Sequence, residues 1–386
     1  MEKRKSAVRK AAFAVISVLL VLSSAVCSAL HIAGSGSLLS INTIAAETTL
    51  SSSFGKPRYV NTGNKTETSA VSLQREESRE VIPEISGISQ DNSIAAETQK
   101  TRKFTAGSIS SRELEEYDKA HEGEEKYPVV EYSITKGDIS YKGIQVKNSS
   151  SFDLDIKTEL ERNCDVKLEK TDKPQVLIYH THTCESFLDY DTGYYYESFY
   201  ARSENKKKNV CAVGDEITQQ LNSLGIKTLH DTSLHDSPGY SGAYYRSSDT
   251  VKEYLKKYPT IKVVLDIHRD GIGTDTQRNK PVCTVNGRKA AQIMILAGYN
   301  CDGDKSFDHW KSNLNFALRL QQEAQKSYPG LMRPLYFGDF VYNMDINNGS
   351  LLIEIGADSN TVDEARYSGY LLGNVIAKVL SGKNYE

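Results

Sequence analysis

Hydrophobic and polar residues follow three different patterns along this chain of 386 residues. After a strongly basic N-terminal segment, an apolar run from Ala11 to Ile32 is interrupted only by Ser, Cys and His. From residue 34 to 125, polar residues and Gly are frequent, and no apolar periodicity is sustained. Apolar segments of strand or helix length then recur up to the C-terminus. The pattern predicts a cytoplasmic tail and transmembrane anchor over 1–33, a flexible stalk over 34–125 and a folded domain over 126–386.

The apolar run is long enough to cross the hydrocarbon core of a bilayer. Basic residues ahead of it favour a cytoplasmic N-terminus, which would place the rest of the chain outside the membrane. A cleaved signal peptide is the alternative, and small residues around Ala29 and Ala45 permit it. Because the run is longer than the apolar core of about 7–15 residues typical of signal peptides, we expect an uncleaved single-pass anchor.

In the folded domain, strands and helices alternate after Pro174. Buried strands are predicted by short apolar runs: 175–179, 261–267, 291–297 and 350–355. Helices are predicted by apolar spacing and by start and stop signals: 210–224, 249–258, 311–327 and a last helix from the capping box Thr361–Glu364 to Leu380. The alternation predicts an α/β fold with a mainly parallel, twisted sheet flanked by helices on both faces.

Charge and cysteine content narrow the functional classes. The net charge is −3 with dispersed basic residues, which argues against nucleic acid as the main partner. No CxxC pair is present among the six cysteines, so we expect buried or incidental thiols rather than a metal cage. A disulfide among the five cysteines after the anchor stays open at this stage.

Three predicted strands end in polar residues that an apolar core would reject. The segments are VLIYHTHTCE from Val176, VVLDIHRDG from Val263 and LLIEIGADSN from Leu351. In open α/β sheets, sites form beyond the carboxyl ends of the strands. Two histidines and two glutamates are therefore expected to converge there.

Two histidines and one glutamate are a recurrent ligand set of catalytic zinc, with the fourth position left to water. We expect His182, Glu185 and His268 to be the ligands, and Glu354 to take a proton from the water and pass it to the leaving group. The H-x-x-E spacing of His182 and Glu185 is a weak signal by itself, since a solvated loop would look the same. His180 lies two residues before His182, so on a strand both side chains would point to the same face. It is an alternative ligand or supports the ligands from behind.

Charged residues beside His268 offer two interpretations. Arg269 is a candidate for binding a substrate carboxylate or the oxyanion, but it also has a neighbouring anion, Asp270, with which it would pair locally. The segment His230–Asp236 follows another predicted strand, and its histidines either contact the site or only bond structurally. Three tyrosines and an arginine follow this segment: Tyr240, Tyr244, Tyr245 and Arg246. They either form one wall of a peptide-binding groove or pack against the rest of the domain.

At this point the motifs resemble a known family. The segments IYHTHTCESF at Ile178, LHDTSLHDSPGYSGAYYRS at Leu229, VVLDIHRDG at Val263 and IEIGADSNT at Ile353 resemble the stage II sporulation protein P family, from about Tyr127 to the C-terminus. The resemblance implies a zinc-amidase fold of the phosphorylase/hydrolase-like type and hydrolysis of peptidoglycan during forespore engulfment. It implies cleavage of the amide between N-acetylmuramic acid and L-alanine, and of stem-peptide cross-links.

The resemblance also implies surroundings and partners. The domain would lie outside the mother-cell membrane that engulfs the forespore, with stage II sporulation proteins D and M as partners. In one respect the sequence departs from the wider amidase pattern, where the glutamate ligand lies well beyond the first histidine. Glu185 is much closer to His182, and Glu197 and Glu204 are the nearby alternatives.

Two other functions use the same residues. A metallocarboxypeptidase-like peptidase would show the same order of ligands and act on free peptides. A peptidoglycan-binding module without catalysis would have no need of a general base such as Glu354 at a buried strand end. A purely structural anchor would leave the polar groups at three strand ends unexplained.

Overall fold

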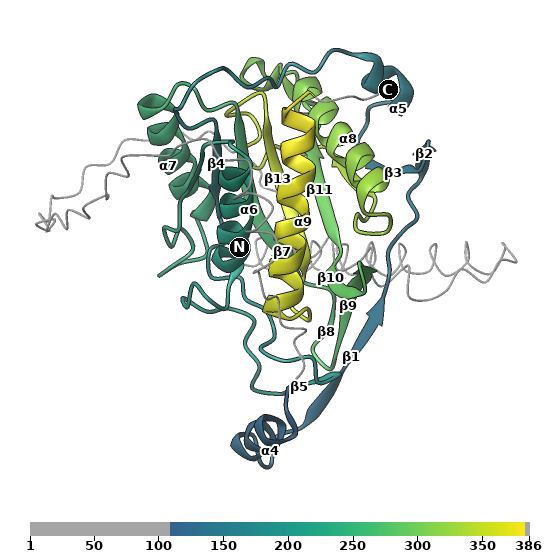
Figure 1. Cartoon of the computed structure of the whole chain (residues 1–386), viewed down its shortest axis with the longest axis vertical. Helices are drawn as coiled ribbons and strands as arrows, with labels where there is room; N and C mark the ends of the chain where they lie inside the picture. The colour runs from purple at the N-terminus through teal and green to yellow at the C-terminus, as the bar shows by residue number, and fades with distance from the viewer. Residues whose placement is uncertain (1–108, 383–386) are drawn as a thin grey trace, which may run out of the picture. The chain divides into compact units, whose positions relative to one another are not determined.

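The computed structural model describes residues 109–382 (Figure 1). The expected tail, the anchor and the stalk up to residue 108 lie outside the described residues. Within residues 109–382, no helix combines the length and the apolar character needed to cross a membrane. The described part has a mixed α/β fold with two sheets.

Eight of the described strands form the large sheet, in the order β2-β3-β12-β11-β13-β7-β4-β6. Their bounds are β2 Ile139–Tyr141, β3 Ile144–Ser149, β4 Val176–Tyr179, β6 Thr228–His230, β7 Val263–Asp270, β11 Ile293–Gly298, β12 Leu335–Gly338 and β13 Ser350–Ala357. Strands β6, β4, β7 and β13 run parallel. Strands β11, β12 and β3 also run parallel to one another, but antiparallel to β13.

The sheet is therefore mixed, which corrects the prediction of a mainly parallel sheet. The change of direction has a simple origin: β11 follows β10 (Arg288–Ala291) after a single residue, Gln292, with no crossover helix between them. Parallel strands of one sheet need a crossover connection, usually a helix. The chain between β7 and β11 contains no helix, and β11 runs antiparallel to β13 and β7. No helix is predicted between the strands 261–267 and 291–297, so the alternation that indicated a parallel sheet does not hold at this connection.

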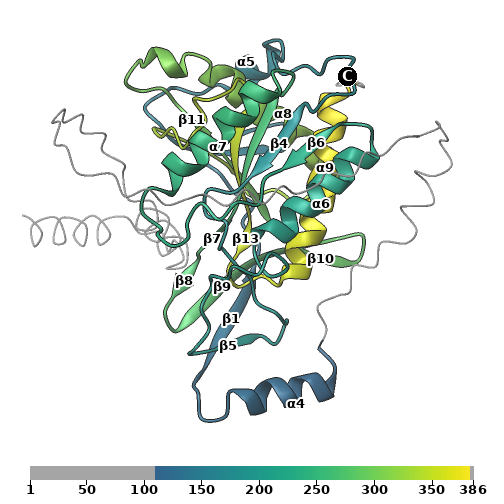
Figure 2. The same cartoon turned by 90° about the vertical axis from the view of Figure 1, so that its left-hand side faces the viewer.

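Helices cover both faces of the large sheet, as predicted. Along β4, Val176 and Ile178 join the core formed with helices α6 (Val210–Ser223), α8 (Trp310–Ser327) and α9 (Val362–Leu380). The alternate residues Leu177 and Tyr179 pack with Val251 of α7 (Ala243–Lys257) on the opposite face. Figure 1 shows α6, α9 and α8 side by side over one face, and Figure 2 shows α7 on the other side of the sheet from α6 and α9.

Local signals explain where these helices begin and end. Asn209 caps α6 by accepting the N–H of Cys211, and Gly225 beyond its end has φ of 84°, a conformation that favours glycine. The capping box of Thr361 and Glu364 at the start of α9 is present as predicted. Helix α7 starts six residues before the predicted 249, because its N-cap is a glycine without a side-chain cap and gives no sequence signal.

A smaller sheet has the order β10-β9-β1-β5, with β8 paired to β9. The bounds are β1 Lys126–Tyr132, β5 Tyr194–Tyr196, β8 Gly273–Thr274 and β9 Gln277–Val285. Helix α4 (Ser111–Ala120) is held against it because Asp118 accepts hydrogen bonds from the hydroxyls of Tyr194 and Tyr196. Residues 111–120, which the prediction places in the stalk, are thus helical.

Two short helices complete the described part: α5 (Ile156–Glu161) and the 3-10 turn Lys305–Phe307.

The cysteines of residues 109–382 are free thiols: Cys164, Cys184, Cys211, Cys283 and Cys301. The disulfide left open by the sequence is therefore not formed among these five. Cys27 lies outside the described residues.

Candidate active site

The three polar strand ends meet on one face of the large sheet. Strands β4, β7 and β13 are neighbours, and Glu354 on β13 lies in register with His268 on β7. His182 and Glu185 come from the turn directly after β4. All four side chains are buried. The structure thus brings the predicted residues together, while their roles stay predictions.

The contacts within this group are close. His268 Nδ1 lies 3.3 Å from Glu185 Oε2. The rings of His182 and His268 are nearly perpendicular, with centroids 5.4 Å apart. Of the alternative carboxylates, Glu197 and Glu204 are exposed, so Glu185 is the buried glutamate of this segment that faces a histidine.

Burial and charge act differently on the members of the group. Burial lowers the pKa of His182 to about 4, which leaves a neutral imidazole near pH 7. Burial also lowers the pKa of His268, but the carboxylates of Asp266 and Glu185 outweigh it and raise that pKa well above its ordinary value. For Glu354, burial first and then Asp270 raise the pKa well above its ordinary value.

Three buried atoms of the group have no hydrogen-bond partner within the described structure: Nδ1 of His182, Nε2 of His268 and Oε2 of Glu354. A buried polar atom without a partner costs about 1–3 kcal/mol, so such atoms are rare unless something else binds them. Two imidazoles and a carboxylate are ligands that catalytic zinc accepts. The donor set and the unpartnered Nδ1 atom therefore fit a zinc ion.

Asp266 is a site residue that sequence reasoning missed. It lies two residues before His268 on β7, and its Oδ1 atom is 2.9 Å from His268 Nε2. The carboxylate is fixed from behind by Thr181, whose N–H donates to Oδ1 at 2.8 Å and whose hydroxyl donates to Oδ2 at 2.6 Å. A carboxylate behind a metal-binding histidine sets its ring orientation and raises its basicity. The available signal was an aspartate inside the buried run VVLDIH.

Arg269 lies beside the group, and its donors face backbone carbonyls. Its guanidinium donates to the carbonyl oxygens of Ser186 at 3.1 Å and Ala201 at 2.6 Å, and its N–H donates to Glu185 at 3.1 Å. The expected local pair with Asp270 is not formed through side chains, since Asp270 pairs with Arg333 at 2.9 Å. Contact of Arg269 with a substrate stays a prediction.

His180 faces away from His182, although the sequence suggested that both point to the same face. The strand ends at Tyr179, so its alternation does not extend to these residues. The His180 Nδ1–H donates to the carbonyl of Ile267 at 2.8 Å, and Nε2 lies 2.8 Å from His230 Nε2. Both ring nitrogens of His180 are thus engaged under α6, away from Glu185.

The segment after β6 forms a bonded loop beside the group. His235 contacts the carbonyl of His180 at 2.7 Å and the hydroxyl of Thr250 at 2.9 Å, so both of its nitrogens are in structural hydrogen bonds. Asp236 accepts the N–H of Cys184 and pairs with Arg202 at 2.5 Å. This loop places Tyr240 against the site.

Tyr240 lies flat on His182, with ring centroids 4.2 Å apart and planes 6° apart. Tyr244 meets His182 edge-on at 5.5 Å. Arg246 donates to the carbonyls of His235, Ser241 and Gly239 and so holds the loop in place. Tyr240 and Tyr244, two of the tyrosines suggested by the sequence, therefore border the site. Arg246 bonds backbone carbonyls of the loop.

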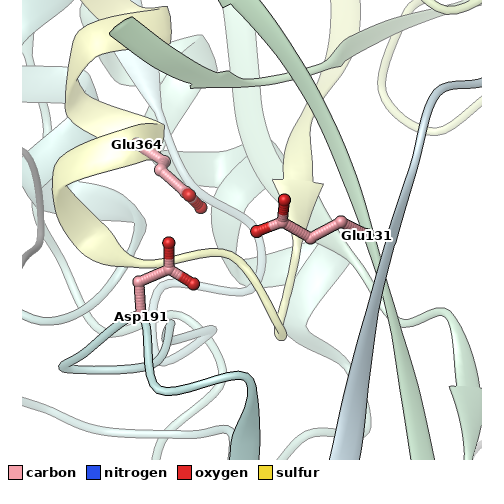
Figure 3. A group of neighbouring side chains, drawn as sticks. All are labelled: Glu131, Asp191 and Glu364. Atoms are coloured by element: carbon pink, nitrogen blue, oxygen red, sulfur yellow. The ribbon is translucent and has the colours of Figure 1, made fainter.

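A second carboxylate group lies where the small sheet meets α9. Figure 3 shows Glu131, Asp191 and Glu364 pointing toward one another, and one carboxylate oxygen of each lies within 4.8 Å of the others. The buried ammonium of Lys280 lies among them, 2.7 Å from Glu131 and Asp191 and 3.0 Å from Glu364. Lys289 adds a second cation at 2.6 Å and 2.8 Å from the first two. Because lysine already neutralises these carboxylates, we do not take this group as a metal site.

Comparisons with solved structures give low similarity. The apo form of the N-acetylmuramyl-L-alanine amidase Ami1 from Mycobacterium abscessus is 15% identical and covers 54% of this chain and 97% of its own, with a TM-score of 0.31. The CwlD amidase from Clostridioides difficile, solved in complex with the GerS lipoprotein, is 12% identical and covers 54% and 98%, with a TM-score of 0.32. With TM-scores this low, neither structure bears on the chemistry of this chain.

Sequence comparison identifies the family. Stage II sporulation protein P of Bacillus subtilis (strain 168) is 29% identical over 219 residues, which is 54% of this chain and 51% of that protein. The alignment thus spans about half the length of this curated relative. The model of the family described as Stage II sporulation protein P (SpoIIP) matches residues 57–377. Since this match extends over most of the sequence, the chain belongs to the stage II sporulation protein P family.

Proposed function

We propose that this chain is a zinc-dependent N-acetylmuramoyl-L-alanine amidase that hydrolyses peptidoglycan during engulfment of the forespore. The observation that carries the proposal is the gathering of His182, Glu185, His268 and Glu354 at neighbouring strand ends. Family membership supports peptidoglycan as the substrate. We extend the proposal to cleavage of stem-peptide cross-links, which is the same amide hydrolysis on a second bond.

Each residue has a role in this proposal. His182, Glu185 and His268 would hold the zinc ion, with Asp266 orienting His268 from behind. A zinc ion held there would supply Lewis acidity to the scissile carbonyl and to the attacking water. The side chain of Arg269 holds the loop that carries Glu185 and so keeps that carboxylate next to His268.

Glu354 is the proposed proton carrier. Its carboxyl is buried, Oε2 has no partner within the described structure, and its pKa is raised. A carboxyl with a raised pKa accepts a proton from water more readily and holds it until the amine leaves. Glu354 would therefore act as general base in the attack and as general acid when the amide breaks.

The setting of the protein is also proposed from the family and the sequence. The apolar run 11–32 would anchor the chain in the mother-cell membrane, with the domain outside the cytoplasm. Stage II sporulation proteins D and M are the proposed partners. Peptidoglycan is the proposed macromolecular substrate.

Glu354→Gln is the variant that tests the catalytic proposal. It removes the proton carrier without changing the size of the side chain, so we expect sacculus hydrolysis to fall by about 10²–10⁴-fold while bound zinc and thermal stability stay unchanged. Glu204→Gln, at the exposed alternative carboxylate, is the control and should keep full activity. Mass analysis of fragments from digested sacculi, with and without a chelator, provides the measurement. Full activity in Glu354→Gln would overturn the mechanism.

The same digestion separates the proposal from its rivals. Release of stem peptides from the glycan supports an amidase, and conversion of cross-linked peptide dimers into single stem peptides supports the second cleavage. A carboxypeptidase would release single C-terminal residues from free peptides. A binding module would retain the protein on sacculi with no soluble fragments.

A further inference from the structure

Partly exposed aromatic rings continue from the candidate site toward β12. Tyr240 lies on His182, and Tyr244 meets His182 edge-on. Tyr244 stacks on Tyr342 with centroids 5.3 Å apart, Tyr342 contacts Phe340 at 5.1 Å, and Phe340 stacks on Tyr336 at 5.8 Å. We call Tyr240, Tyr244, Tyr342, Phe340 and Tyr336 the aromatic row. None of its members is fully buried, so the rings offer surface to a ligand as well as to one another.

The loop that carries Tyr342 has an unusual backbone. Tyr342 and Asn343 are consecutive non-glycine residues with φ of 41° and 59°, in the left-handed region. Such a conformation costs about 1–2 kcal/mol per residue, and a bulky residue adopts it only when its surroundings enforce it. Backbone strain of this kind concentrates at functional sites. Here it directs the ring of Tyr342 onto Tyr244.

Hydrogen bonds tie this loop to the proposed metal ligand. Asn343 Nδ2 donates to Ser247 Oγ at 3.0 Å, and Ser247 Oγ lies 2.7 Å from Thr181 Oγ1. Thr181 donates to Asp266 at 2.6 Å, and Asp266 lies 2.9 Å from His268. The aromatic row is therefore held at a fixed place relative to His268, as a substrate subsite must be.

Charge decides which part of a peptidoglycan substrate fits the row. Phe340, Tyr342 and Asn343 are uncharged, and carboxylates flank them in the chain at Asp339 and Asp345. Stem peptides carry free carboxylates, which these aspartates would repel. N-acetylated sugar rings are neutral, and their apolar faces stack on aromatic rings. Arg202, a cation, lies over Tyr240 at 5.2 Å, at the opposite end of the row.

We propose that the aromatic row is a saccharide subsite, in which Tyr342 and Phe340 stack on N-acetylated sugar rings of the glycan strand. This inference rests on the proposed function, because it assigns the sugar side of the same substrate to these rings. The row orients the glycan so that the amide next to a muramic acid residue reaches His268 and Glu354. It makes Tyr342 a specificity residue that holds the substrate without touching the reacting atoms.

Binding of an uncleavable saccharide tests the subsite apart from catalysis. The probe is the neutral tetrasaccharide of N-acetylglucosamine, titrated calorimetrically into the full chain. Loss of one stacked ring should weaken its binding about 3- to 10-fold in Tyr342→Ala and in Phe340→Ala. Tyr342→Phe keeps the ring and should bind like the unaltered protein. Tyr245→Ala, an exposed tyrosine that is 65% accessible and outside the row, is the matched control.

The outcomes separate this inference from the proposed amidase activity. The inference is overturned if the unaltered protein does not bind the tetrasaccharide, or if Tyr342→Ala and Phe340→Ala bind it as well as Tyr245→Ala does. It is also overturned if the two variants weaken binding of a free stem peptide instead. Thermal melting of each variant verifies folding. Selective loss of saccharide binding supports the subsite even if sacculi are not digested, in which case the amidase proposal alone fails.

Discussion

Two groups of side chains in this molecule each bring carboxylates together and differ in how the charges are neutralised. In the group of Glu131, Asp191 and Glu364, the ammonium of Lys280 supplies the counter-charge from within the chain. In the candidate active site, the atoms Nδ1 of His182 and Oε2 of Glu354 have no partner within the described structure. The carboxylates of the first group are neutralised by lysine within the chain, whereas the second group has room in its bonding for a metal ion and water.

The difference shows that proximity of carboxylates is a poor guide to a metal site. The three oxygens around Lys280 are close together because a cation already holds them there. The donors of the candidate site include imidazoles, which suit zinc better than carboxylates alone. The useful observation is where unpartnered imidazole and carboxylate atoms lie together, and His182, His268 and Glu354 each have such an atom.

The largest expected effect comes from removing Lys280. Lys280→Ala leaves the buried Glu364 without its cation, whereas Glu131 and Asp191 keep Lys289. We therefore expect a cost at the lower end for a broken buried pair, about 3 kcal/mol of unfolding free energy. Lys289→Ala is the matched control, since Lys289 bonds Glu131 and Asp191 with a side chain that is 46% exposed. An exposed pair contributes about 0–1 kcal/mol. Urea unfolding of both variants measures the difference.

Added Ca²⁺ sharpens this test. In Lys280→Ala, the oxygens of the three carboxylates would be free to bind Ca²⁺. Millimolar Ca²⁺ should therefore restore part of the stability that this variant loses. The unaltered protein, in which Lys280 occupies the group, should not gain stability from Ca²⁺. Equal costs for the two lysine variants would show that Lys280 is not the central counter-ion.

Zinc should stabilise the candidate site and not the lysine-filled group. At a free zinc concentration of about 100 times Kd, binding to the folded state adds about 2.7 kcal/mol. We expect a chelator to lower the melting temperature of the unaltered protein and to leave that of His268→Ala unchanged. The same chelator effect in both proteins would place the metal elsewhere.

A smaller effect is expected for Asp266→Asn. The amide keeps the shape of the side chain but removes the charge behind His268, and loss of such support typically weakens metal binding about 10- to 100-fold. Competition with a zinc indicator measures this change. Asp215→Asn, at an exposed carboxylate that contacts His230, is the control and should bind zinc normally. Unchanged affinity in Asp266→Asn would contradict the assigned role.

The smallest effect concerns pH at the lysine-filled group. Burial raises the pKa of Asp191 and Glu131, but Lys280 and Lys289 lower both below their ordinary values. An acid with a lowered folded pKa adds stability above its unfolded pKa, about 3.9 for Asp and 4.3 for Glu. That stability is lost as the pH falls through the folded pKa. The difference in unfolding free energy between the unaltered protein and Glu131→Gln should therefore shrink as the pH falls from 7 toward 3.

The fully buried strands were predictable, and the half-exposed ones were not. Strands β4, β7 and β13 contain apolar runs because helices cover both of their faces. Strand β9 mixes polar, charged and apolar residues without a clear alternation, since it belongs to the small sheet. Its hairpin with β10 gave no strong periodicity, and the reversal of β11 was therefore missed.

For the site, residue types and strand ends predicted which side chains converge. They did not predict what supports them. Asp266 is a charged residue inside a buried strand, and its partner Thr181 lies 85 residues away in sequence. Gly214 in α6 is similar: a Cβ atom there would collide with His230 and lie 2.9 Å from His180. Only the folded chain shows that this glycine makes room for the histidine pair.

The bonds of Arg269 have a consequence for how quickly an ion would be captured. This arginine joins the end of β7 to Glu185 and to the carbonyls of Ser186 and Ala201, so the proposed ligands are aligned once the chain has folded. Association would then be governed by diffusion and by loss of the ion's hydration shell, with no slow rearrangement of the loop. Such a centre would refill rapidly after transient loss of its metal.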